Sequence, residues 1–170
     1  PYAVTVEALA APARGTAWRR GMAEPRALHG WASLVRTRHG ACEHDVSARR
    51  LDLHGRGPRG SALLVHHRAA DGTSRAWLGW RLGDASLHAT THLTVEVDAA
   101  PASDDAHGGY PVPTALRWTG PELEGEAALK SPQLSIDPVD ALPRLVQMLY
   151  SLRSRPRRIW AAAEMELRLK

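Results

Sequence analysis

Two short stretches of the chain place carboxylates beside imidazoles, the combination that general acid–base catalysis near neutral pH requires. They are Glu43-His44-Asp45 and Asp52-Leu53-His54. Neighbouring residues of a strand point to opposite faces, so Asp52 and His54 share a face, whereas His44 does not share one with the acids beside it. A further imidazole, His67, ends an apolar run. We predict Asp52, His54 and His67 as acid–base candidates; a solvated, salt-bridging face is the alternative.

Other reactive groups are weaker candidates. Histidines 66, 67, 88 and 92 could fall on one sheet and suggest zinc, but the face with His88 is expected to be wet, and strand spacing does not secure three convergent ligands. Cys42 could act as a nucleophile only with His44, and a half-buried structural cysteine is the simpler interpretation. No glycine-rich phosphate loop, paired C-x-x-C or G-x-S-x-G motif occurs. We therefore predict no metal and no cofactor.

Histidines 66, 67, 88 and 92 would be positioned by a β-meander from Ser61 to Val97, around which the rest of the chain is organised. Three runs with period-two alternation are separated by Ala70-Asp71-Gly72-Thr73 and Gly83-Asp84-Ala85-Ser86, both rich in turn formers. Ala76, Leu78, Trp80 and Leu82 fall on one face of the middle run, and the apolar side chains of 87–97 on one face of a single long strand. In the first run, the two sets of alternate residues, Leu63-Val65-His67 and Ala62-Leu64-His66, both start apolar and end in a histidine. One of His66 and His67 should therefore point inward.

The rest of the chain adds short strands and one helix. Alternation or strand-like composition predicts strands at about 2–9, 29–39, 42–54, 114–118, 122–129, 133–136 and 159–170. Leucines and Val146 at helical spacing predict a helix over about 140–153, packed on the sheet. Strands at this spacing indicate an all-β protein, a barrel or a sandwich, and closure is favoured because it removes exposed edges. We predict one domain over 1–170, an antiparallel lipocalin-like barrel wide enough for a small ligand.

Composition limits the class of protein. At 170 residues, 44% hydrophobic and 24% charged, the chain is that of a folded domain, without the run of about 18 apolar residues that a membrane span requires. Cys42 is the only cysteine, which agrees with a reducing, cytoplasmic compartment. The net charge is +4, but acids are spread throughout, so we predict no nucleic-acid partner. The sequence starts at Pro1 without a methionine, so it can be part of a longer chain.

Two segments carry a family resemblance. His66 to Asp84 (HHRAADGTSRAWLGWRLGD) and Tyr110 to Gly120 (YPVPTALRWTG) are similar to parts of the lipocalin-like superfamily of carotenoid hydratase and AttH type. The resemblance covers about Leu51 to Gly120. It implies a protein that hydrates, isomerises or cyclises polyenes or polyketides without a cofactor, or only binds apolar ligands. Relatives usually have two lobes, and some carry an acid–histidine–tryptophan–glycine loop, where this chain has Asp52-Leu53-His54-Gly55-Arg56 without the tryptophan.

These observations together predict a function. We expect the chain to bind a hydrophobic small molecule (a polyene, terpenoid or polyketide) in a barrel lumen and to promote its cyclisation, isomerisation or hydration. The predicted walls are Trp31, Leu78, Trp80, Tyr110 and Trp118, although six tryptophans in a chain without phenylalanine could simply fill its core. A non-catalytic carrier and a purely structural interaction domain are the alternatives, and a homodimer is compatible with the sequence. Arginines 153, 155, 157 and 158 suggest a solvated linker or a contact with an anionic partner.

Overall fold

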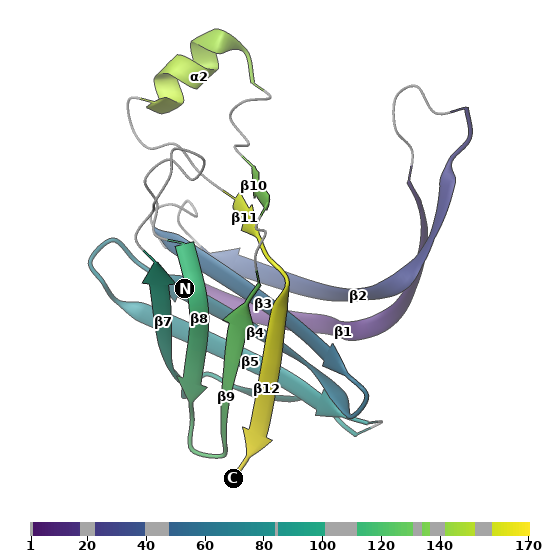
Figure 1. The fold of residues 1–170 in the computed structure, drawn as a ribbon, viewed down its shortest axis with the longest axis vertical. Coiled ribbons are helices and arrows are strands. Elements are labelled where there is room, and N and C mark those ends of the chain that lie inside the picture. The colour runs from purple at the N-terminus through teal and green to yellow at the C-terminus, as the bar shows by residue number, and fades with distance from the viewer. Residues whose placement is uncertain are drawn as a thin grey trace. The chain divides into compact units, whose positions relative to one another are not determined.

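The structure is a computed structural model. It describes residues 2–17, 23–39, 48–83, 85–100, 112–130, 134–136, 142–151 and 158–170. These residues are mostly β, with antiparallel sheets and one short helix, α2 (Arg144–Ser151) (Figure 1). The chain divides into two compact units, Pro1–Thr94 and Val95–Lys170, which we call unit 1 and unit 2.

Unit 1 contains a four-stranded sheet and a two-stranded ribbon. The sheet has the order β3 (Arg49–Gly57), β4 (Gly60–Arg68), β5 (Ser74–Leu82), β6 (His88–Thr90), and the ribbon pairs β1 (Tyr2–Ala17) with β2 (Arg26–His39). The β4–β5 turn forms because Gly72 adopts a positive φ of 86°, while the Asp71 carboxylate accepts a hydrogen bond from the Thr73 amide at 2.8 Å. This local turn chemistry fixes the register between β4 and β5.

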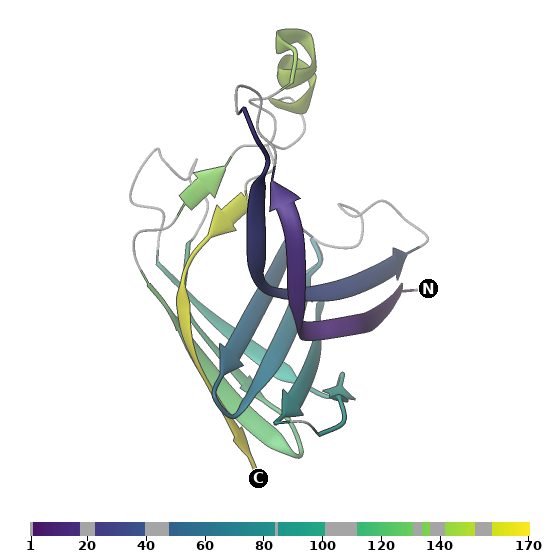
Figure 2. The same ribbon diagram turned by 90° about the vertical axis from the view of Figure 1, so that its right-hand side faces the viewer.

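Unit 2 contains a second four-stranded sheet, in the order β12 (Ala163–Leu169), β9 (Leu123–Leu129), β8 (Val112–Thr119), β7 (Thr94–Ala100). A short pair, β10 (Leu134–Ile136) with β11 (Arg158–Trp160), completes the strands of this unit. The last strand of the chain, yellow in Figure 2, lies beside the green β9, and the two are antiparallel neighbours. Residues more than thirty positions apart are therefore brought into register.

The central strand β4 is buried on both faces from Ser61 to His67. On one face, Leu63 and Val65 pack with Leu9 of β1, and side chains of β2 and β5 border this cluster. The other face, which we call the apolar face of unit 1, is formed by the buried side chains of Leu53, Ala62, Leu64, Leu78 and Trp80. The two faces thus differ: the ribbon covers one, and the other is lined by buried apolar side chains.

The sheet of unit 2 has one apolar and one charged face. Leu116, Trp118, Leu123 and Ala127 are buried on the apolar face. Gly125 lies opposite Trp118, and a Cβ at this position would overlap the indole ring and the Glu166 carbonyl oxygen. The glycine is therefore required by the close approach of the tryptophan.

The predicted barrel is not confirmed, because the described strands form open sheets and no closed barrel. The single long strand predicted over 87–97 was wrong. It is divided into β6 and β7, which belong to different sheets, and Thr90 Oγ1 accepts a hydrogen bond from the His92 amide at 3.2 Å where the strand breaks. A threonine hydroxyl that binds the backbone in this way offers it an alternative to the sheet ladder.

Other elements also differ from the sequence-based expectation. The first strand extends beyond the predicted end, through Pro12 to Ala17. A β-bulge, where Ala10 adopts a φ of 44°, absorbs the irregularity, and β1 pairs with β2 again after it. The predicted helix forms over Arg144–Ser151, but its leucine stripe is exposed and not packed on a sheet. Of the predicted elements, residues 42–47, 133, 140–141 and 152–153 lie outside the described part of the chain.

Candidate functional site

The three predicted acid–base residues lie on the face of the unit 1 sheet that the ribbon covers. In the register of β3 and β4, Asp52 is opposite Val65 and His54 is opposite Leu63, while His67 lies two positions further along the same face. His67 is buried, whereas Asp52 and His54 are exposed. The Asp52 carboxylate forms an ion pair with the Arg50 guanidinium at 2.9 Å. The register thus confirms the shared face, and Asp52 has a cationic partner of its own.

A different histidine makes the more distinctive contact in unit 1. His66 is on the apolar face and is only 3% exposed, and its Nε2 lies 2.6 Å from the hydroxyl oxygen of Ser74. Ser74 is the exposed first residue of β5. Because His66 pairs with Ala76 and Arg68 with Ser74, the two side chains are diagonal neighbours on one face of the ladder.

The surroundings of His66 keep its imidazole neutral. Burial lowers the pKa of His66 below its usual value, and the nearby charges of His67, Arg68 and Arg49 lower it further. The Nδ1 atom is buried and has no hydrogen-bond partner among the described residues. Since buried polar atoms are nearly always paired, this imidazole nitrogen on an apolar face is an exception that calls for an explanation.

The contact with Ser74 lets the imidazole exchange its two tautomers. When Nε2 carries the proton it donates to the Ser74 oxygen, and the buried Nδ1 is then a base. When the Ser74 hydroxyl donates to Nε2, Nδ1 carries the proton and is an acid. Because Ser74 is exposed, this pair connects a buried nitrogen with solvent. It can therefore move one proton between an apolar environment and water.

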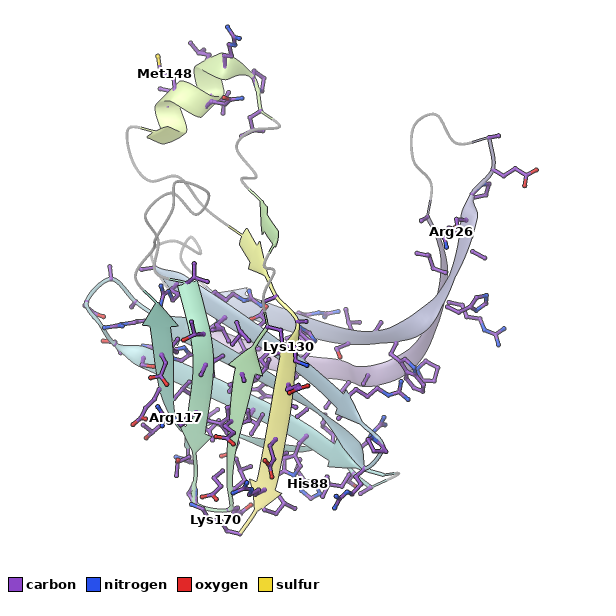
Figure 3. The ribbon with its side chains drawn as sticks, in the orientation of Figure 1. Arg26, His88, Arg117, Lys130, Met148 and Lys170 are labelled. Atoms are coloured by element: carbon purple, nitrogen blue, oxygen red, sulfur yellow. The ribbon has the colours of Figure 1, made fainter. Side chains whose placement is uncertain are left out.

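The predicted wall residues are distributed over both units. Leu78 and Trp80 share the apolar face of unit 1, and the Trp80 ring stacks on His88 with centroids 5.5 Å apart; His88 is labelled in Figure 3. Trp118 is fully buried in unit 2. Trp31 is 51% exposed on β2 and carries the Arg56 guanidinium 3.2 Å above its ring, a cation–π contact. Tyr110 lies outside the described residues.

A hollow of about 650 Å³ lies on the charged face of the unit 2 sheet. Its floor includes Ala115 and Ala128, and its rim includes Asp98, Arg117, Glu126, Glu164 and Glu166. Most of these charges pair within the unit: Arg117 with Asp98 at 2.7 Å, Arg168 with Glu166 at 2.9 Å, and Lys130 with Glu164; Arg117 and Lys130 are labelled in Figure 3. Such mutual neutralisation is typical of a solvated sheet face.

Among the residues whose positions the structure gives, no three histidine, cysteine or acidic side chains gather in a way that could hold a metal ion. In that same part of the chain, no helix has the length and apolarity to cross a membrane. Comparison of the chain with protein families, with curated proteins and with solved structures finds no match. The resemblance to the lipocalin-like superfamily stays a prediction.

Sequence reasoning assigned the acid–base role to His67 and missed the pair of His66 with Ser74. The sequence did contain a signal for His66. It alternates with Leu64 along the strand, so it falls on the face of Leu64 and Leu78. What the sequence could not supply was the turn length. Only the observed turn makes Arg68 the partner of Ser74 and thereby brings the hydroxyl beside His66.

We expect the free energy of unfolding to fall as the pH drops below about 6.5, because unfolding releases His66 to take up a proton. The folded pKa is lower than the unfolded one, so the unfolded chain binds more protons between the two values. The contribution of His66 to the free energy of unfolding is thus fully present above the unfolded pKa and is lost as the pH falls toward the folded pKa. One imidazole contributes a slope of at most about 1.4 kcal/mol per pH unit.

Urea unfolding of the protein and of His66→Gln between about pH 5.5 and 7.5 measures this contribution. The variant is expected to show the shallower pH dependence. His92→Gln, at an exposed position between β6 and β7, is the matched control and should keep the slope of the unchanged protein. Equal slopes for all three proteins would mean that His66 is not held neutral by burial.

Proposed function

We propose that the chain binds a hydrophobic small molecule and transfers a proton to or from it through His66. The molecule would be a polyene, a terpenoid or a polyketide, and the reaction a cyclisation, isomerisation or hydration that needs no cofactor. A lipocalin-like fold is part of the same proposal. The observation that carries it is the buried Nδ1 of His66, an acid–base atom without a described partner on an apolar face.

The proton transfer follows from the geometry. Nδ1 takes a proton from the bound molecule while Nε2 gives its proton to the Ser74 oxygen, and the hydroxyl proton of Ser74 passes to water. The reverse sequence returns a proton to another atom of the molecule, which completes an isomerisation. A neutral imidazole suits both directions, because one of its nitrogens accepts a proton while the other donates one.

The apolar face supplies the binding part of the proposal. Leu64 and Leu78 are fully buried beside His66, and Trp80 adds an aromatic surface. Apolar side chains with one convergent polar group are the usual composition of a small-molecule site. A carrier would use the same face without the proton transfer, and it is the alternative that the experiment must separate.

Binding is tested with cis-parinaric acid, a fluorescent conjugated polyene. We expect saturable binding, and at least about tenfold weaker binding for Ala76→Phe, because Ala76 is half-buried opposite His66 and a phenyl ring would lie on the same face beside that residue. Ala89→Phe, exposed and paired with Gly79 on the other face, is the matched control and should bind normally. Equal affinities of the two variants would contradict the proposed location.

A second experiment distinguishes an enzyme from a carrier. The small molecules that co-purify with the unchanged protein and with His66→Gln are extracted and identified by mass spectrometry. An enzyme is expected to yield a product from the unchanged protein and its unreacted isomer or anhydro form from the variant. A carrier would yield the same compound from both. Absence of any bound compound, together with no binding of cis-parinaric acid, would end the proposal.

A further inference from the structure

Helix α2 presents its most apolar side chains to solvent. Leu145, Met148 and Leu149 are 69%, 57% and 58% exposed, and their spacing of three and four places them on one face. The labelled Met148 side chain projects away from the helix in Figure 3. Val146 and Gln147, outside this face, are only half-exposed. A helix that packs on a protein core has the opposite arrangement.

The exposed face lies in a strongly basic part of the chain. Arg144, the first residue of α2, is exposed. In the sequence, no acidic residue occurs between Asp140 and Glu164, while arginines stand at 144, 153, 155, 157 and 158. Aliphatic exposure is therefore combined with a local excess of positive charge.

We propose that the face formed by Leu145, Met148 and Leu149 docks on the surface of an anionic phospholipid bilayer. Aliphatic side chains enter the boundary between headgroups and acyl chains, and the positive charge of Arg144 and of the arginines that follow in the sequence attracts anionic headgroups. The helix lies in the plane of the interface, as its eight residues, about 12 Å long, cannot cross a bilayer.

Charge and size favour a bilayer over other occupants. A nucleic acid would be attracted by the positive charge, but it offers no apolar surface for the exposed side chains of Leu145 and Leu149. A stable protein interface needs a contact much larger than two helical turns can provide. A lipid surface interacts favourably with both the exposed aliphatic side chains and the positive charge, and it can accommodate a small helix. Docking at this site is weak and reversible, because few residues contribute to it.

Co-sedimentation with vesicles tests the proposal on the full chain. We expect binding to phosphatidylcholine vesicles with about 30% phosphatidylglycerol, at least about tenfold weaker binding to pure phosphatidylcholine, and marked weakening at about 0.5 M salt. Leu145→Gln/Leu149→Gln should bind the anionic vesicles at least about tenfold less. Both changed positions are exposed, so the fold is retained.

The control is Leu28→Gln/Leu34→Gln, which removes two comparably exposed leucines from β2 and should leave binding unchanged. A second measurement needs no substitution. With ¹³C-methyl methionine and anionic bicelles that carry a spin-labelled lipid, the Met148 signal should broaden and that of half-buried Met165 should not.

Four results would overturn the proposal. The first is equal binding to neutral and anionic vesicles, and the second is equal loss of binding in the two leucine variants. The third is self-association that disappears in Leu145→Gln/Leu149→Gln while no vesicles are bound, which would assign the face to a second copy of the chain. Equal broadening of Met148 and Met165 would contradict docking through α2 in the same way.

Discussion

A Gly125→Ala substitution is expected to lower the free energy of unfolding of unit 2 by about 3 kcal/mol. The added Cβ would overlap the Trp118 ring on one side and the Glu166 backbone oxygen on the other. Trp118 is 1% exposed, and the oxygen belongs to the neighbouring strand β12, so neither can withdraw. Denaturant unfolding and amide exchange of β9 and β12 measure the loss.

Two other glycines provide the controls for this prediction. At Gly79 the three atoms nearest to an added Cβ all belong to the half-buried Trp77 ring, so Gly79→Ala tests an overlap with a side chain and no backbone atom and should cost less, about 1 to 2 kcal/mol. At Gly57 nothing lies within 4 Å, and the effect should stay within about 0.5 kcal/mol. Trp118→Leu combined with Gly125→Ala should cost less than the sum of the single changes.

The result also decides between two interpretations of Trp118. If the indole is a movable wall of a ligand site, it will swing aside and Gly125→Ala will be tolerated. If it fills the core, the substitution will destabilise the sheet by the full amount. The buried ring and its contact with Gly125 favour core filling, which the sequence had offered as the alternative for all six tryptophans.

Local patterns predicted the part of the fold that depends on neighbours in sequence. Alternation along 61–82 and the turn at Asp71-Gly72 were sufficient to predict β4 and β5, because side-chain period and turn chemistry act over a few residues. The shared face of Asp52 and His54 followed from the same period.

What failed depends on contacts that the pattern does not encode. Alternation continues through 91–93, but the Thr90 hydroxyl bonds to the His92 backbone and the chain passes from one sheet to another. Helical spacing predicted the apolar stripe of α2 correctly, yet periodicity does not reveal whether a stripe is buried, and Leu145 and Leu149 are exposed. The His66–Ser74 pair required the exact length of the β4–β5 turn.

Leu78→Ala is expected to destabilise unit 1 by about 3 kcal/mol, because it removes a fully buried side chain from the centre of the apolar face and leaves a cavity. Leu82→Ala is the matched control: Leu82 lies on the same strand and the same face but is 43% exposed, so its loss should cost less than about 1 kcal/mol. Urea unfolding of both variants gives the two values.

The same pair of variants also tests whether the apolar face of unit 1 binds a hydrophobic molecule. An apolar guest that enters the Leu78 cavity binds only the folded chain, so cis-parinaric acid should raise the stability of Leu78→Ala more than that of Leu82→Ala. The difference arises because the new space lies on the face that carries His66, next to Leu64. Equal stabilisation of the two variants would mean that the guest binds elsewhere and that His66 Nδ1 cannot act on it.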